Sequence, residues 1–411
     1  MKVSNRPVPT PPDSWTFRSR FRRGAFGWRG SKLAIERIDE ALAEIRRVLR
    51  QDPVAAAQGA VLLLQRLSPA LSQIDSSSGA LGNATHAAVA ALVPIIASAP
   101  VGEHERSALL DKLFEALQDD DPPYIESLGA HWGELCVTEQ LASSWADQLL
   151  PTVQRVLQER QGGVFSWFNG TGACYSALFK AGRHEELLGL LDLTPRPIWQ
   201  DLVWGGRVLV ARGEFDEAIE YLGRRAGGYA PVAALARFAE EALLQAGRRE
   251  QAYECYAIPA HQANSRLATY RAIAKIYPEI APDRLLRDLI ASTPGEEGKW
   301  FATAKSLKRF ELAIELVWAS PCDPKTLTRA ARDHLDDHPA FAAQAAMAAM
   351  HWMATGHAFE LTGTDVLETL RYGTEAAQHL GQRDEIRQRL LQSMAGDHRT
   401  AQWMRQVVGI A

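Results

Sequence analysis

The sequence predicts an all-α protein, an α-solenoid of antiparallel helix pairs with an irregular N-terminal arm. Three observations predict this fold class. Apolar residues recur at helical spacing from residue 32 onward, and short runs of Gly, Pro or Asp divide them into segments of about 12 to 20 residues. The period-two alternation of β-branched residues that marks strands is almost absent. A glycine-centred turn also recurs along the chain, as expected of a repeat protein.

Residues 1–31 form the predicted arm, because prolines crowd residues 7–12 and oppose regular helix. Aromatic residues then alternate with cations, which leaves two interpretations open. In the first, Phe17, Phe21, Phe26 and Trp28 anchor the arm on the first helices while its arginines meet acidic residues, namely Glu36, Asp39 and Glu40. In the second, the arm binds single-stranded nucleic acid through phosphate contacts and base stacking. The residues of that site would be Arg18, Arg20, Arg22, Arg23, Trp28 and Arg29.

The region 32–160 predicts helical hairpins. Its first segment places Ile38, Leu42, Ile45 and Leu49 at helical steps, so one face of this helix is apolar. Asp52–Pro53 then supplies an N-cap and a first-turn proline for a second helix, whose apolar residues include positions 61, 64, 67 and 71. We expect the two helices to pack as a pair.

Residues 161–325 contain the repeat. Its turn occurs as Ala181-Gly-Arg-His-Glu-Glu-Leu187, Arg212-Gly-Glu-Phe-Asp-Glu-Ala218 and Ala246-Gly-Arg-Arg-Glu-Gln-Ala252, so the glycines are 31 and 34 residues apart. A copy without glycine follows at residues 308–313, and a degenerate one at 276–281. We expect the glycines between paired antiparallel helices, and Ala218, Ala252 and Ala313 at buried helix contacts. Residues 326–411 are expected to form a helical cap continuous with the solenoid.

The second of these turns carries a resemblance to a known family. Gly206, Gly213 and Ala218 match the small positions of the tetratricopeptide repeat, and Leu209 and Leu222 match its bulky apolar positions. Residues 165–325 therefore resemble this family, although the other copies lack the first-helix glycine and the spacing varies. The resemblance implies a right-handed α-solenoid whose concave groove binds protein. The chain as a whole also resembles an uncharacterised bacterial helical-repeat family, and that resemblance implies no activity.

Alignment on the repeat gives the positions that face the groove in tetratricopeptide proteins. They are Gln200, Arg207, Arg237, Glu241, Gln245, Arg266, Tyr270 and Lys305. Cations outnumber anions in this set, so the resemblance implies a groove that binds another protein or an acidic peptide through charge-assisted hydrogen bonds. The alternative for these positions is a solvated helix face. We expect a non-enzymatic scaffold, with nucleic-acid binding by the arm as the alternative function.

Composition limits the compartment and the partners. Lys and Arg number 45 against 49 Asp and Glu, so no overall charge draws the chain to nucleic acid or anionic lipid. The cysteines form no CxxC pair, which argues against a zinc finger and fits a reducing cytosol. The apolar stretch of residues 87–101 is shorter than a bilayer span. The pair Arg22–Arg23 could mark a twin-arginine export signal, but the apolar core of such a signal does not follow it. We therefore expect a cytoplasmic protein without a transmembrane helix.

No catalytic motif is recognised, and no cofactor is expected. His334 and His338 are four residues apart, which on one helix would place both imidazoles on one face, with Asp333 and Asp337 on the adjacent face. A metal needs a third ligand that no distant motif supplies, so the pair is a weak metal candidate and a metal-dependent hydrolase is the weakest alternative function. The glycine-rich stretch at residues 169–172 lacks a dinucleotide-binding pattern and predicts a helix start capped by Asn169 or Thr171.

Overall fold

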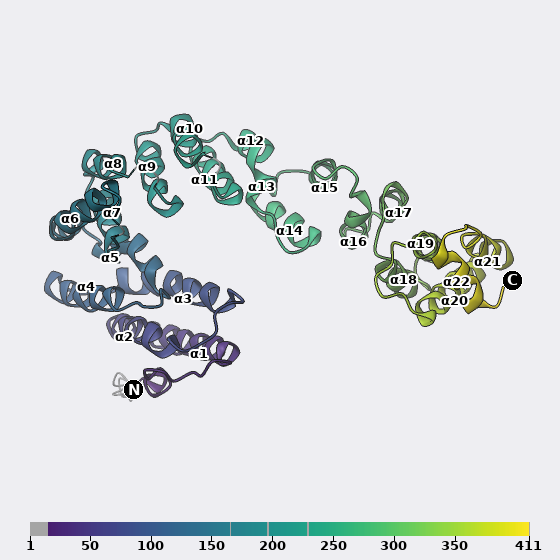
Figure 1. Cartoon of the computed structure of the whole chain (residues 1–411), viewed down its shortest axis with the longest axis horizontal. Coiled ribbons are helices and arrows are strands. Elements are labelled where there is room, and N and C mark those ends of the chain that lie inside the picture. Colours follow the sequence, from purple (N-terminus) through teal and green to yellow (C-terminus); the bar gives the residue numbers. More distant parts are fainter. Residues whose placement is uncertain (1–14, 165, 195–196, 228–229, 411) are drawn as a thin grey trace, which may run out of the picture. The chain divides into compact units, whose positions relative to one another are not determined.

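The computed structural model describes residues 15–164, 166–194, 197–227 and 230–410 (Figure 1). Every regular element in these ranges is helical, which confirms the predicted all-α class. The prolines of residues 7–12 lie outside the described residues, as do parts of two of the Gly or Pro runs that divide the predicted helical segments, at residues 195–197 and 227–228. The chain divides into two compact units, residues 1–231 and 232–411, and each is described by itself.

The first unit opens with helices that follow the sequence prediction. The Asp52 side chain accepts a hydrogen bond from the α2 backbone at 2.9 Å, which makes it the N-cap, and Pro53 occupies the first turn. The α1 and α2 helices pack as a pair, with Ile38 and Leu64 buried between helices. These opening elements are η1 (Thr16–Ser19), α1 (Ser31–Leu49), α2 (Pro53–Leu71), α3 (Ala80–Ala97) and α4 (Glu103–Gln118).

Two of these helices are unusually apolar. Among the described residues, α2 and α3 have the length and composition to cross a membrane, with mean hydropathies of 1.2 and 1.6. The apolar stretch around residue 90 belongs to a helix that begins at Ala80, so the expectation that it is too short is wrong. Both helices pack against each other and against α1, and 67% and 44% of their apolar windows are buried inside the protein.

Residues 15–30, which we call the N-terminal strap, pack against α1 and α2. Phe17, Phe21 and Phe26 are buried in the core of the first unit, and the Phe21 ring is in edge-to-face contact with the other two. The Glu44 carboxylate accepts hydrogen bonds from the backbone and hydroxyl of Thr16, at 2.9 and 2.5 Å. These contacts confirm the first interpretation for the three phenylalanines, whereas Trp28, which was expected to anchor the arm as well, is exposed, so that part of the prediction is wrong.

The rest of the first unit contains two of the predicted repeat turns. Gly182 and Gly213 have φ angles of 68° and 79°, and each lies between two paired helices, as predicted. Ala218 is fully buried, and the close helix approach beside it uses Gly205, where a Cβ would lie 2.5 Å from the Tyr221 ring. The elements are η2 (Glu126–His131), α5 (Trp132–Cys136), α6 (Glu139–Gln161), α7 (Thr171–Lys180), α8 (His184–Asp192), α9 (Trp199–Ala211) and α10 (Phe215–Ala226).

The second unit continues with helices of the same kind. They are α11 (Val232–Gln245), α12 (Arg249–Ala252), the π-helical turn η4 (Tyr253–Ala257), α13 (Ile258–Ala260), α14 (Arg266–Ile276), α15 (Pro282–Ala291), η5 (Glu297–Trp300), α16 (Phe301–Ser306), α17 (Phe310–Ala319), α18 (Pro324–Asp333), α19 (Pro339–Ala354), α20 (Gly363–His379), α21 (Arg383–Gln392) and α22 (Arg399–Val408). Ala252 and Ala313 are fully buried, as predicted. A buried carboxylate, Glu240, accepts a hydrogen bond from the Tyr277 hydroxyl at 2.7 Å and lies 2.5 Å from His261 Nε2.

The repeat turns share one hydrogen-bond pattern across both units. The residue after each turn glycine donates its N–H to the carbonyl five residues back, at 3.0 Å in the Gly182 turn and 2.8 Å in the Gly247 turn. Lys308 makes the same turn with a φ of 58°, which is rare for a residue with a side chain. A further copy at Gly381 joins α20 and α21 and was not predicted. The predicted copy at residues 276–281 also joins two helices, but its Tyr277 has a negative φ and a different turn.

Candidate functional site

The first unit contains a cavity of about 660 Å³ whose walls come from the ends of several helices. Four carboxylates line it, from Asp120, Asp121, Glu126 and Asp201, and the one arginine among its described lining residues is Arg160. The aromatic and apolar side chains of its lining include Phe168, Trp167, Ile198 and Trp204. We call this site the acidic cavity. Its volume is within the range of pockets that hold small ligands or single side chains of a partner.

Asp201 has the most perturbed carboxyl of the acidic cavity. It belongs to the first turn of α9, and burial raises its pKa to about 6, although the Arg160 guanidinium acts in the opposite direction. Asp201 is partly buried and makes no side-chain hydrogen bond to another residue of the described ranges, so the Arg160 charge offsets only part of its desolvation. A carboxyl held in this state within a cavity is typical of functional sites.

Trp167 lies at the rim of the acidic cavity and is 56% exposed. Its indole N–H donates to Asn169 Oδ1 at 2.7 Å, and the Arg160 guanidinium lies 5.1 Å from its ring centre. Asn169 Nδ2 in turn donates to the Leu117 carbonyl at the end of α4, at 3.0 Å. The prediction that Asn169 or Thr171 caps α7 is therefore wrong: the cap residue is Gly170, without a side-chain hydrogen bond, and Asn169 instead holds the rim.

Two further polar groups of the acidic cavity, Asp120 and Ser127, differ in their hydrogen bonding. Asp120 is buried, and its two carboxylate oxygens accept backbone hydrogen bonds from Tyr124 and Ile125 at 2.9 and 2.8 Å. Burial nevertheless raises the pKa of Asp120. Ser127 Oγ, which also lines the cavity, is buried and has no hydrogen-bond partner among the described residues. The cavity thus presents polar groups that a ligand can satisfy.

Two predicted groove residues belong to the first unit and lie at this site. Gln200 is exposed and lines the acidic cavity. Arg207 is exposed one turn beyond Trp204, and its guanidinium lies 4.4 Å from the centre of that ring. The first-unit part of the predicted groove is therefore next to the acidic cavity.

The other predicted groove residues belong to the second unit. Arg237 donates to the Ala260 carbonyl at 2.8 Å, and Arg266 forms an ion pair with Glu296 and lies 5.1 Å from the Trp300 ring centre. Both guanidinium groups therefore have partners within their own unit. The other positions are Glu241 and Gln245, exposed on α11, Tyr270, buried on α14, and Lys305, partly buried on α16.

The residues of the predicted nucleic-acid site on the strap differ in their exposure and in their partners. Trp28 is 68% exposed, whereas the three phenylalanine rings that could stack on bases are buried. Arg20 pairs with Glu40, as the first interpretation expects. The other arginines of the predicted set, Arg18, Arg22, Arg23 and Arg29, are exposed on the surface.

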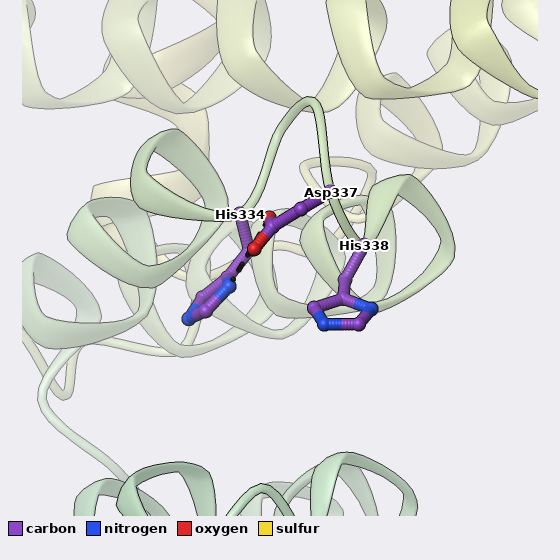
Figure 2. Close-up of side chains that lie close together, drawn as sticks. All are labelled: His334, Asp337 and His338. Atoms are coloured by element: carbon purple, nitrogen blue, oxygen red, sulfur yellow. Dashed lines mark ion pairs between the residues drawn. The ribbon is translucent and has the colours of Figure 1, made fainter.

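His334 and His338 do not share one helix, so the arrangement considered for a single helix does not apply. His334 ends α18 and His338 precedes α19, so the loop between them brings Asp337 to the two imidazoles (Figure 2). One ligand atom from each of the three residues can be chosen so that all lie within 4.8 Å of one another. Asp337 is therefore the potential third ligand, and it comes from the same loop rather than from a distant part of the sequence.

The cysteines give no sign of chemistry. All four are free thiols, and Cys136, Cys174 and Cys322 are buried. Burial raises the pKa of each of these three to about 12, so their thiolate forms are suppressed near neutral pH. Cys136 is thus an unreactive packed thiol.

The sequence interpretation missed the main residues of the acidic cavity, namely Asp120, Ser127, Arg160, Trp167 and Asp201. One local signal was present, since Gln200 and Asp201 precede Trp204 by four and three residues and therefore lie on the same side of α9 as that ring. Comparison with known proteins finds no family model that matches this sequence and no similar curated protein.

Proposed function

We propose that this chain is a non-enzymatic helical-repeat protein that binds a segment of a partner protein in the acidic cavity. The helix pairs would stack in the right-handed manner of tetratricopeptide proteins. The bound segment would insert a lysine or arginine side chain beside apolar residues. The single observation that carries the proposal is the desolvated Asp201 carboxyl, which lacks a hydrogen-bond partner among the described residues while four carboxylates line one cavity.

A cationic ligand fits this cavity for an electrostatic reason. Burial of an unpaired carboxylate costs free energy, and an ammonium or guanidinium group that enters the site recovers part of it through charge-assisted hydrogen bonds. Arg160 compensates only in part, because the pKa of Asp201 stays raised beside it. Ser127 Oγ supplies a further unpaired acceptor in the lining.

A protein segment fits better than a small metabolite because the rim is apolar and exposed. Trp167 and Ile198 are 56% and 47% exposed beside the cavity. Exposed aromatic side chains next to a polar pocket are typical of surfaces that anchor peptides. The Trp167 ring is held by Asn169 and Arg160, so it is oriented before binding.

An acidic ligand in the arginine-lined groove has weaker support. The Arg266 guanidinium pairs with Glu296, and Arg237 is bonded to a backbone carbonyl. An acidic peptide would have to exchange these internal bonds for its own, which reduces the net gain. We therefore place the binding site in the first unit.

The test uses three synthetic peptides of one apolar framework that carry a central Lys, Gln or Glu. Their affinity for the full chain is measured by fluorescence anisotropy. We expect the Lys peptide to bind best, and Asp201→Asn to weaken it at least tenfold at pH 8. Asp111→Asn, which removes an exposed carboxylate on α4 outside the cavity, is the charge-matched control and should leave affinity unchanged.

The outcomes separate the proposals. Equal affinity for the three peptides, or no effect of Asp201→Asn, would contradict a cation site at this cavity. Preference for the Glu peptide, lost in Arg237→Gln, would instead support the acidic-peptide groove. Binding of a single-stranded oligonucleotide with a steep salt dependence, lost when Arg22 and Arg23 are both changed to Gln, would support the nucleic-acid alternative.

A further inference from the structure

We propose that His334, Asp337 and His338 form a binding site for one divalent transition-metal ion of the zinc, nickel or copper class. The three residues lie on the loop that joins α18 to α19 in the second unit (Figure 2). The site is independent of the acidic cavity, which belongs to the first unit. It is proposed as an ion-binding site, with no reaction attached to it.

The spacing of two ligand atoms already matches a bound ion. His334 Nδ1 and Asp337 Oδ1 are 3.4 Å apart. Two ligands at 2.0–2.1 Å from one tetrahedral zinc ion are separated by about 3.4 Å. His338 completes the set, and an approach of about 1.4 Å at most brings its ring nitrogen from the 4.8 Å limit to the same spacing. A side-chain rotation can supply this shift, because Asp337 and His338 are exposed.

His334 Nδ1 has no hydrogen-bond partner among the described residues. The atom is buried, and the Asp337 carboxylate is near enough for an ion pair. A protonated imidazole paired with Asp337 is the competing explanation. A metal ion between the two atoms would satisfy the ring nitrogen in its neutral form, which is the form that coordinates metals.

Aromatic rings pack against the two imidazoles on one side. The Phe310 ring centre lies 4.3 Å from that of His338 and 5.2 Å from that of His334, and Phe341 lies 5.4 Å from His334. These contacts cover one side of the histidines with apolar rings, while His338 and Asp337 are exposed to solvent. A site with one apolar wall and one open side admits an ion without rearrangement of the helices.

The surrounding charges are mainly negative. Asp333 pairs with Arg332 at 2.8 Å, and Asp336 lies 4.0 Å from His379 Nε2 of α20. The end of α18 favours a cation and the start of α19 opposes it, so the two helix dipoles roughly cancel. The identity of the ligands therefore decides which ion binds. Two imidazoles and one carboxylate favour zinc, nickel or copper over magnesium or calcium.

The test is isothermal titration calorimetry on the full chain, purified without a histidine tag, with zinc chloride or nickel chloride at pH 7.5. We expect one ion per chain, no detectable binding of magnesium, and at least a tenfold loss of affinity in His338→Ala and in Asp337→Asn. His104→Ala, which removes an exposed histidine on α4, is the matched control and should keep the affinity. The melting temperature of the wild type should rise with zinc, and that of His338→Ala should not.

Three results would overturn the proposal. Wild type that binds no ion, or binds it as well after His338→Ala, would exclude this site. Loss of affinity in His104→Ala would indicate unspecific binding by surface histidines. His334 packs against Phe310 and Phe341, so His334→Ala can destabilise the fold, and the exposed His338 and Asp337 variants therefore carry the test.

Discussion

Replacing Asp201 by asparagine should stabilise the first unit at alkaline pH. Burial raises the pKa of Asp201 from 3.8 to about 6, so the folded state binds its proton more tightly than the unfolded state. The wild type therefore loses stability as the pH rises from about 4 to about 6, and the full cost is present above pH 6. Two pKa units correspond to about 3 kcal/mol, which is the most that ionisation of Asp201 costs the folded state.

Asparagine keeps the shape of the side chain but cannot ionise. We expect Asp201→Asn to raise the free energy of unfolding by about 2 to 3 kcal/mol at pH 8 and by about half as much at pH 5, where the wild-type carboxyl is mainly protonated in the folded state. The assay is urea denaturation of the full chain at both pH values, followed by circular dichroism. The same variant should lose the cationic peptide, so stability and binding change in opposite directions.

Two results would refute this reasoning. A variant that is no more stable than the wild type at pH 8 would mean that the Asp201 charge is solvated or compensated. An equal gain at pH 5 and pH 8 would mean that the effect does not come from ionisation. Asp111→Asn on the exposed face of α4 is the control and should change stability by less than about 0.5 kcal/mol at either pH.

Other substitutions test the fold. Gly59→Ala would place a Cβ 2.2 Å from the Trp15 ring, so it should displace the strap, cost about 1 to 3 kcal/mol and expose residues 15–30 to limited proteolysis; an unchanged proteolysis pattern would contradict the packing. Tyr277→Phe removes a hydrogen bond to the buried Glu240 carboxylate and should cost about 1.5 to 3 kcal/mol in urea denaturation, and no cost would mean that water or His261 compensates. Lys308→Gly should raise the free energy of unfolding by about 0.5 to 1 kcal/mol, and with it the melting temperature, because it relieves a positive φ. Gly213→Ala should lower the free energy of unfolding by a similar amount, and a change of the same sign in both variants would refute the turn argument.

The local parts of the fold were predictable because their signals lie within a few residues of one another. The apolar spacing of α1 and the Asp52–Pro53 start of α2 depend only on neighbouring positions, and both predictions are confirmed. The turns at Gly182, Gly213 and Gly247 were found because glycine marks a positive φ. Lys308 makes the same turn without glycine, so only its spacing from the other copies revealed it.

The details of contacts between helices were less predictable. Gly206, assigned to the small position of the repeat, is buried on α9, but the sequence did not single out its neighbour Gly205, on which the Tyr221 ring packs. Asn169 has a side chain suited to capping α7, yet it bonds to the Leu117 carbonyl and the Trp167 indole. A single sequence does not reveal which of several possible hydrogen-bond partners a side chain will meet in the folded chain.

The acidic cavity combines side chains that the sequence keeps far apart. Asp120 follows α4, Arg160 ends α6 and Asp201 opens α9, and none of them belongs to a recognised motif. Each of these positions, taken alone, is an ordinary polar residue near a helix terminus. What distinguishes Asp201 is burial without a hydrogen-bond partner among the described residues, and burial is decided by how the helices pack. In this all-α chain, we infer that the periodic residues specify the helices, whereas the side chains of the candidate site lie where helix ends converge and periodicity gives no information.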